Sequence, residues 1–306
     1  MNSRTVSVLF VLLAAIWGSL FIFIEIGLRD IPPVLFAALR HDIAAVVTVG
    51  YAAVVTARWY PRNRGDWWLV ALGAVFFVGL YNGLLFIGQQ DVTGGMAAIL
   101  VAMNPILAAL FGWLLIPKSR LAGPGIVGLV LGFCGVALVA RPDLSAPLES
   151  ESLGALLVLL STACLAFGSV LVERAGSDLS TEGFVAWSNV FGAVFLHAIS
   201  FALPTESVAQ FDITVSAVGT LLYLALVGSG LSAILYFLLL DELGAVEINL
   251  VSYAAPIFTA ILGWLVLDES LDPLSIAGFL TIFLGFVLIK RKELLSETQK
   301  LPLLTD

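Results

Sequence analysis

The stretch NPILAALFGWLLI at residues 104–116 returns 151 positions later as APIFTAILGWLVL at residues 255–267. Six of the thirteen aligned positions are identical, among them a proline, a glycine and a tryptophan. Leu and Ala coincide often between apolar helices, whereas Pro, Gly and Trp seldom align at fixed spacing by chance. The same shift, within one residue, places Trp17–Ser19 over Phe167–Ser169. The chain therefore contains an internal repeat.

The composition predicts that most of the chain lies in lipid. Hydrophobic residues make up 60% of the sequence and charged residues 12%, with a mean hydropathy of +1.06, whereas roughly a quarter of the residues of a soluble domain are charged. A bilayer core of about 30 Å needs about 20 apolar residues in a helix that bonds all its own backbone groups. Ten such runs are predicted: Val6–Leu28, Val34–Ala57, Trp67–Ile87, Met96–Ile116, Gly123–Ala140, Leu153–Val172, Phe184–Leu203, Val215–Leu240, Ile248–Leu267 and Pro273–Ile289.

Each repeat holds five of these runs, and an odd number of crossings inverts the second repeat relative to the first. Equivalent loops then lie on opposite sides of the membrane. The loop Pro117–Arg120 is basic and its counterpart Asp268–Leu271 is acidic, as inversion requires. Basic residues mark cytoplasmic loops. With the N-terminus inside, the inner segments hold eleven Lys and Arg, and the outer loops hold only Arg29 and Arg141.

The predicted fold is thus an all-α integral membrane protein, with ten transmembrane helices as two inverted five-helix repeats and both N and C termini cytoplasmic. The repeats are expected at residues 1–143 and 150–292, followed by a short polar cytoplasmic tail at 293–306. Inverted repeats recur in secondary transporters, in which two halves rock around a site near the bilayer midplane. We therefore expect alternating-access transport of a small polar solute across the cell membrane.

Other classes of function find little support in the sequence. The net charge is -8, and the acids are scattered without a block of like charge, so no nucleic-acid partner is expected. Cys134 and Cys164 lack metal-ligand or CxxC spacing, and we expect neither a metal nor a cofactor. Gly228–Gly230 superficially suggests a serine protease loop, but no GxSxG or HExxH pattern is present. An intramembrane enzyme is therefore a remote alternative.

Several segments together resemble a known family. They are Ala15–Ser19, Pro32–Arg40, Asn104–Trp113, Pro256 with Gly263–Trp264, and Asp268–Glu269. In their order and spacing the chain resembles the EamA-type ten-helix branch of the drug/metabolite transporter (DMT) superfamily, from about residue 5 to 292. The resemblance implies a central cavity formed by helices 1–4 and 6–9, and export or exchange of amino acids or related metabolites. Many relatives carry a Lys late in helix 1, where this chain has Glu25.

Ionisable side chains inside the spans are costly and normally face the bundle interior. Four of them concentrate in the first two spans, at Glu25, Arg40, His41 and Asp42. We expect an ion pair between Glu25 and Arg40; the alternative is that Glu25 extends to the headgroups while Arg40 bonds carbonyls at a helix end. Asp42 lies about 200° around the helix from Arg40, so its partner must lie on another helix. His197, on the seventh span, is interpreted as a hydrogen-bonding residue between helices.

Polar and aromatic residues at mid-membrane depth complete the predicted transport site. Amides, hydroxyls and proline-freed carbonyls can bind a polar solute, and His41 can respond to a proton gradient. The same side chains also hold membrane helices together, which is the alternative interpretation. The candidates are Trp17, Gly18, Glu25, Arg40, His41, Tyr81, Asn82, Asn104, Pro105, Trp187, Asn189, Tyr236, Tyr253 and Pro256.

Some alternatives stay open at this stage. A drug or lipid efflux protein (flippase) of the same superfamily would have a similar sequence pattern. Coupling to a proton or to a counter-solute is equally open. Gly128 and Gly132 form a small-residue spacing on the fifth span that would serve either packing within the chain or a dimer contact, so both a monomer and a homodimer are compatible with the sequence.

Overall fold

The computed structural model describes residues 2–116, 123–141, 150–206, 211–244, 248, 250–270 and 272–300. This part of the chain is helical and contains no strand. The elements are α1 Ser3–Gly27, α2 Pro33–Val55, α3 Arg64–Leu72, η1 Gly73–Leu80, α4 Tyr81–Gly88, α5 Gly94–Val101, α6 Asn104–Leu115, α7 Gly123–Ala140, α8 Ser150–Ala175, α9 Thr181–Ala202, α10 Val215–Leu222, η3 Tyr223–Leu231, α11 Ser232–Leu243, α13 Val251–Leu267 and α14 Pro273–Lys300.

The apolar spans agree with those expected from the sequence. Within the described residues, nine helical segments are long and apolar enough to cross a bilayer, and a tenth, α13, is apolar but shorter. The loop at Pro117–Arg120, the residue Leu271 and the end of the tail at 301–306 lie outside the described residues. The all-helical membrane fold predicted from hydropathy is thereby confirmed.

Three spans are interrupted rather than continuous α-helices. In the third and the eighth, π-helical turns (η1 and η3) join two α-helical pieces. In the fourth, α5 ends at Val101 and α6 begins at Asn104. Pro105 has no N–H to give the carbonyl of Val101, so the helix breaks there and restarts with the proline in its first turn. The π segments at residues 73–80 and 223–231 occupy equivalent places in the two repeats.

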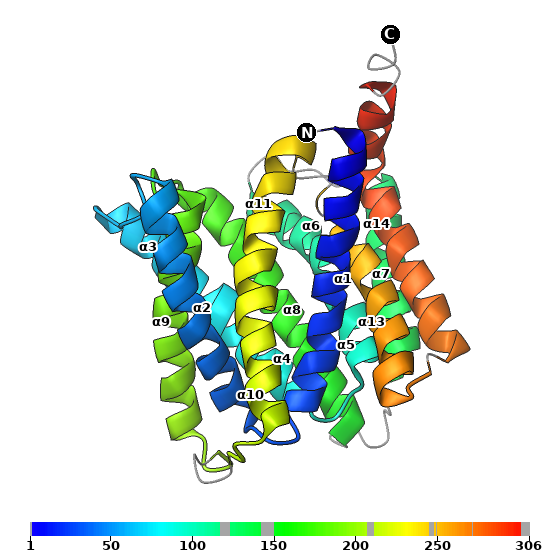
Figure 1. The fold of residues 1–306 in the computed structure, drawn as a ribbon. Coiled ribbons are helices and arrows are strands. Elements are labelled where there is room, and N and C mark those ends of the chain that lie inside the picture. The colour runs from blue at the N-terminus through cyan, green and yellow to red at the C-terminus, as the bar shows by residue number, and fades with distance from the viewer. Residues whose placement is uncertain are drawn as a thin grey trace.

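Helix packing follows the repeat. The first span (α1) packs on the ninth (α13), and equivalently the sixth (α8) packs on the fourth (α6). The second span contacts η3, just as the seventh contacts η1, and α2 and α9 pack on each other. Figure 1 shows α2 and α9 side by side at one edge of the bundle, with α7 and α14 together at the opposite edge. Each contact between a helix of the first repeat and a helix of the second thus has a counterpart in which the two repeats change roles, as expected for two inverted repeats.

The fifth and tenth spans meet through glycines. A Cβ atom on Gly128 would lie 2.4 Å from the carbonyl oxygen of Gly285, and one on Gly135 would lie 2.7 Å from that of Gly278. Gly132 faces Ile106 and Met103 of the same chain. Small residues let two helix backbones approach closely. The predicted small-residue spacing therefore serves packing within the chain.

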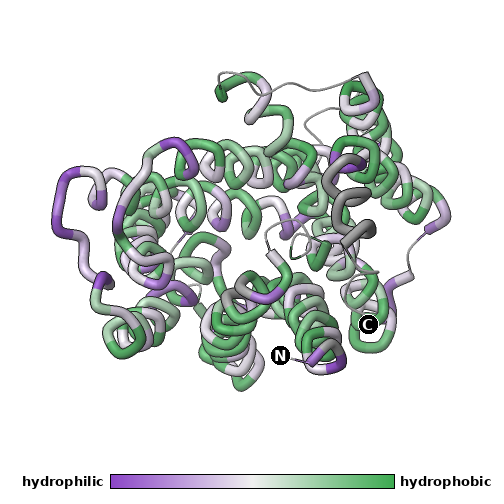
Figure 2. Tube along the Cα trace, turned by 90° about the horizontal axis from the view of Figure 1, so that it is seen from above, coloured by the Kyte–Doolittle hydropathy of each residue, from purple (hydrophilic) through white to green (hydrophobic). Residues whose placement is uncertain are grey.

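The bundle has two ends and an apolar flank. Helix α1 begins and α14 ends at the same end (Figure 1), here called the terminal face, and the opposite end is called the distal face. In the view along the bundle, hydrophilic residues gather in loops and at helix ends, and the helices are mostly hydrophobic (Figure 2). Large apolar side chains are exposed on the flanks, including the repeated pair Trp113 and Trp264. This is the surface that a protein surrounded by lipid presents.

Candidate functional site

A cavity of about 220 Å³ lies between α2, the η1–α4 segment and α9. It combines polar groups with an apolar wall, and we call it the central cavity. Since helices of both repeats form it, it lies where an inverted-repeat protein is expected to carry its site. Its lining residues are Arg40, His41, Phe77, Val78, Tyr81, Asn82, Phe184, Val185, Ser188 and Asn189.

Arg40 brings a positive charge into this cavity. It is 8% exposed, and its Nε donates a hydrogen bond to Oγ of Ser229 at 3.2 Å. Among the described residues, no carboxylate lies within 4.0 Å of its guanidinium nitrogens. The expected ion pair with Glu25 is therefore wrong. The carboxylate of Glu25 instead accepts a hydrogen bond from the backbone N–H of Gly94 at 2.7 Å, near the distal face.

A chain of hydrogen bonds fixes which ring nitrogen of His41 carries the proton. The hydroxyl of Thr48 donates to the carbonyl of Ala44 at 2.7 Å, so it accepts from the side-chain N–H of Asn189 at 3.3 Å. The amide oxygen of Asn189 lies 2.8 Å from Nδ1 of His41. An amide oxygen only accepts, so Nδ1 carries the proton and Nε2 of the neutral ring is left as an acceptor. That Nε2 atom is buried and has no hydrogen-bond partner.

The π-helical segment η1 lines the cavity through Phe77 and Val78, and η3 provides Ser229, the hydrogen-bond partner of Arg40. A π turn leaves backbone carbonyls without their usual partners, and such turns are frequent at functional sites. The amide of Asn82 donates to the carbonyls of Phe77 and Val78, each at 3.0 Å. In the equivalent segment, Ser229 donates to the carbonyl of Leu224 at 3.2 Å while accepting from Arg40. The π segments thus supply one wall of the cavity and the partner of its charged residue.

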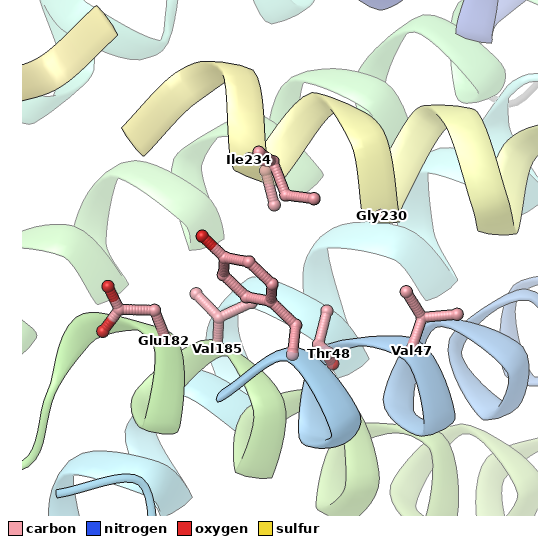
Figure 3. Close-up of a pocket in the computed structure, with 8 residues that line it drawn as sticks. Val47, Thr48, Glu182, Val185, Gly230 and Ile234 are labelled. Carbon is pink, nitrogen blue, oxygen red and sulfur yellow. The ribbon is translucent and has the colours of Figure 1, made fainter. Parts of the chain in front are cut away.

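A second, much smaller hollow of about 20 Å³ lies beside the later turns of α2. Figure 3 shows Val47 and Thr48 of α2 facing Val185 of α9 and Ile234 of α11, with Glu182 at the start of α9. Val185 lines both this hollow and the central cavity. Because α2 ends and α9 begins at the terminal face, the hollow lies between the central cavity and that face.

The distal face is held by contacts between the repeats. The carboxylate of Glu206 accepts hydrogen bonds from the backbone N–H groups of Val34 and Leu35, at 2.7 and 3.1 Å, and so caps the start of α2. The hydroxyl of Thr214 donates to the carboxylate of Asp30 at 2.5 Å. Carboxylates are favourable at helix N-termini, where they meet free N–H groups and the positive end of the helix dipole. These bonds join the start of α2 to the segment after α9, and the loop before α2 to the start of α10.

Two carboxyl groups also meet at the distal face. Glu269, directly after α13, shares a side-chain hydrogen bond with Glu25 at the end of α1. The pKa of Glu269 is raised to about 7, because burial disfavours its charge and the neighbouring Glu25 carboxylate repels it, while Arg29 acts in the opposite direction. A hydrogen bond between two carboxyl groups needs one proton. The raised pKa of Glu269 favours a protonated carboxyl group beside Glu25, at a contact between the two repeats.

The raised pKa of Glu269 predicts a pH-dependent stability. Between about pH 4.5 and 7, folded Glu269 keeps a proton that the unfolded chain has released, so stability falls as the pH rises through this window. We expect the melting temperature of the detergent-solubilised protein to drop between pH 5 and 8, and Glu269→Gln to reduce that drop by about 2 °C or more. Glu173→Gln, at an exposed carboxylate near the end of α8, is the matched control. If the melting temperatures of wild type and Glu269→Gln change in parallel with pH, the raised pKa assigned to Glu269 is contradicted.

Five of the residues predicted for the transport site come together in the central cavity: Arg40, His41, Tyr81, Asn82 and Asn189. Others form contacts between helices. Trp17 stacks on Tyr236 with ring centroids 5.9 Å apart, and the carbonyl of Gly18 accepts from the hydroxyl of Thr259 at 2.8 Å. Trp187 donates from its indole N–H to the carbonyl of Trp59 within an aromatic cluster at the terminal face.

The remaining predicted residues lie at helix breaks or in the core. Asn104 and Pro105 start α6, and the amide oxygen of Asn104 is buried without a partner. Tyr253 packs against Phe283 and Phe286 of α14, and Pro256 is buried within α13. The structure also pairs Asp42 with His197 of α9 at 2.8 Å. This pair confirms that Asp42 has its partner on another helix.

Sequence reasoning missed three residues of the site. Ser188 lines the cavity, is 3% exposed, and its hydroxyl has no partner. Ser229 is the partner of Arg40, and Thr48 fixes the orientation of Asn189. A serine between two glycines is visible at 228–230 in the sequence, but its contact with Arg40 depends on the packing of η3 against α2, which the sequence does not show.

The chain is similar to a family of transporters and to individual proteins along most of its length. Residues 5–141 and 152–291 each match the EamA-like transporter family. The chain is 27% identical to the uncharacterized transporter YvbV of Bacillus subtilis, over 95% of this chain and 93% of that one. It is 24% identical to protein PecM of Dickeya dadantii, over 93% and 92% of the two chains.

A solved crystal structure shows the same fold. It superposes with a TM-score of 0.64 at 18% identity, over 95% of this chain and the whole of the other. The two family matches coincide with the two halves of the internal repeat and together cover most of the chain. The chain therefore belongs to the EamA-like transporter family of the DMT superfamily and is a multi-pass membrane transporter.

Proposed function

We propose that the protein is a secondary transporter that moves small polar metabolites, such as amino acids, across the cytoplasmic membrane by alternating access, as an exporter or exchanger. The observation that carries this proposal is the central cavity. It is lined by helices of both repeats, and it holds a buried charge together with two polar atoms, Nε2 of His41 and Oγ of Ser188, that have no partner among the described residues. Unsatisfied buried polar groups are costly, and a polar solute would satisfy them.

The asymmetry of the two faces supports alternating access. The distal ends of the repeats are joined by Glu206, by Thr214 with Asp30, and by Glu25 with Glu269. The small hollow shares Val185 with the central cavity and lies on the side of the terminal face. In our proposal the terminal face is cytoplasmic, and the structure corresponds to a state closed on the outside. Opening would break the distal contacts while the helices of the two repeats rock past each other.

The proposal treats the protein as a carrier without catalytic activity. Its relatives bear transporter names, and the polar residues of the central cavity, one arginine, one histidine, a serine, a tyrosine and two amides, suit the binding of a solute. A solute in a water-poor cavity is oriented by a few such groups within apolar walls. Coupling to a proton is a further part of the proposal, with the Glu25–Glu269 pair as its candidate site.

Counterflow in proteoliposomes tests the proposal. Vesicles containing the purified protein would be preloaded with a panel of unlabelled amino acids, organic acids, sugars and nucleosides, and uptake of the matching radiolabelled solute would be followed with and without a pH gradient. A carrier is expected to accelerate uptake when the same solute is inside, with saturation. Empty vesicles and vesicles with heat-inactivated protein are the controls.

Two results would overturn the proposal. If no solute of the panel shows saturable counterflow, the metabolite-carrier proposal fails. If fluorescent lipids or hydrophobic cations move instead, the protein is a flippase or drug efflux protein of the same superfamily.

A further inference from the structure

We propose that the solute carried by this protein bears an oxyanion, a carboxylate or a phosphate group, that binds Arg40, and a hydrogen-bond donor that binds Nε2 of His41. This inference rests on the proposed function and deepens it, because it narrows the small polar metabolites named there to anions, and disfavours neutral amino acids. It predicts that net-anionic solutes are carried and that their neutral analogues are not.

The first step is the charge of the cavity. An arginine at membrane depth costs roughly 2.5–3.5 kcal/mol on insertion scales and is normally paired. Arg40 is nine-tenths buried, and within the described part of the chain its guanidinium forms one hydrogen bond, from Nε to the neutral hydroxyl of Ser229. The guanidinium keeps donors for a planar oxyanion, which it binds in a two-pronged geometry. An anionic solute would supply the missing charge.

The second step is the absence of a counter-charge for an ammonium group. None of the described residues that line the central cavity is acidic. Glu25 lies at the distal face with Gly94, and Asp42 is engaged with His197 of α9. Glu182 lines the separate small hollow. A neutral amino acid would therefore leave its ammonium without a carboxylate, whereas an anion with a hydroxyl or a neutral N–H would leave no charge unpaired.

The third step is the acceptor opposite the charge. The hydrogen-bond chain through Asn189 and Thr48 keeps the proton of His41 on Nδ1. In the neutral ring its Nε2, which is buried and has no hydrogen-bond partner among the described residues, is an acceptor, and the Asn82 amide also interacts with the ring. The hydroxyl of Ser188 is also free and can donate or accept. Discrimination by such buried groups is strong, because an analogue that lacks the matching donor leaves them unpaired.

The volume limits the size of the solute. The central cavity holds about 220 Å³, which is below the range of about 300–1,000 Å³ typical of sites for drug-sized ligands. The rings of Phe77 and Phe184 and the side chain of Val78 form its apolar wall. The solute is therefore a small organic acid or a small phosphate ester, with a short carbon skeleton.

Matched pairs of solutes test the inference in the wild-type protein. Counterflow and thermal stabilisation would be measured with L-lactate against L-lactamide and with L-malate against L-malamide, pairs that differ only in whether the acid group is a carboxylate or a neutral amide. Glycerol 3-phosphate is compared with glycerol in the same way. This comparison shows whether the protein carries a phosphate ester, and the lactate comparison shows whether it carries a carboxylate. We expect at least one anionic member to be carried, and its neutral partner to be about 30-fold less effective as a competitor.

Variants then link this preference to the two residues. Arg40→Lys keeps the charge but not the planar fork, so it should retain the preference for anions with weaker binding. Asn189→Leu removes the hydrogen bond that holds the proton on Nδ1 of His41. It should therefore weaken the binding of solutes that have a hydroxyl group more than the binding of solutes that lack one. Propionate, which is lactate without its hydroxyl, provides that comparison.

The outcomes separate the inference from the proposed function. Saturable counterflow of neutral solutes, with the charged partners no better, would overturn the inference and leave the transporter proposal standing. Saturable counterflow of no solute at all would overturn the transporter proposal itself. Equal competition by lactate and propionate in the wild type would remove the role assigned to His41.

Discussion

Replacing Arg40 by glutamine is expected to lower the rate of anion transport by about 100-fold or more, and to leave the protein at least as stable as the wild type. Truncating one member of a buried charge pair typically costs about 2–5 kcal/mol of binding, and about 2.8 kcal/mol corresponds to a factor of 100. In the structure without solute, the guanidinium has no carboxylate partner among the described residues. Its removal therefore relieves a desolvation cost, and the melting temperature should rise by about 2 to 4 °C.

The combination of the two effects is what makes the Arg40 experiment informative. Initial rates in proteoliposomes and thermal unfolding in detergent would be measured on the same preparations. A structural anchor would lose stability on substitution, whereas a residue that binds solute loses transport alone. If Arg40→Gln lowers the melting temperature and transports at the wild-type rate per folded molecule, Arg40 is a packing residue.

Gly18→Val is expected to prevent folding or to lower the melting temperature by about 5 °C or more. A Cβ atom at Gly18 would lie 2.4 Å from the carbonyl oxygen of Ala255 and 2.7 Å from Cβ of Phe258, both on α13. Neither is the end of a flexible side chain, so the two helices must separate. The same contact carries the hydrogen bond from the hydroxyl of Thr259 to the carbonyl of Gly18. The yield of monodisperse protein after size-exclusion chromatography, together with thermal unfolding, measures the effect.

A glycine in open space provides the control. A Cβ atom on Gly112, in α6, would meet nothing within 4 Å, and a helical Gly→Ala change is favourable by up to about 1 kcal/mol. Gly112→Ala should therefore leave the melting temperature unchanged or raise it slightly. Equal behaviour of the Gly18 and Gly112 variants would show that the close approach of α1 and α13 is not required for folding.

Hydropathy and internal repetition predicted the architecture well, because both act over long stretches of chain. A run of about 20 apolar residues has few alternatives to a membrane helix, and the repeated Pro105 and Pro256 with the following Gly-Trp pairs aligned the two halves. The symmetric packing of α1 on α13 and of α8 on α6 follows from that alignment. The π turns were not predictable, because no residue pattern in the Gly73–Leu80 or Tyr223–Leu231 segments differs from an ordinary apolar helix.

The site was predicted less completely, because its residues come together only through tertiary packing. Arg40 and His41 were singled out as ionisable groups in a span, and both line the central cavity. The expected partner of Arg40 was wrong, since depth in the membrane says nothing of which helices are neighbours. Glu25 at the end of α1 meets the N-terminus of α5 and Glu269, whereas Arg40 faces η3. Serines such as Ser188 are too common in membrane helices to be noticed without the cavity.

The most direct test of the central claim, that the central cavity carries the transported solute, is chemical blockage of the cavity at Ser188. In a protein without its native cysteines, Cys134 and Cys164, Ser188→Cys would be treated with a bulky, membrane-permeant methanethiosulfonate reagent, and counterflow would be measured before and after. The proposal predicts that labelling abolishes counterflow and that excess carried solute slows the labelling. Complete labelling with undiminished transport would contradict it.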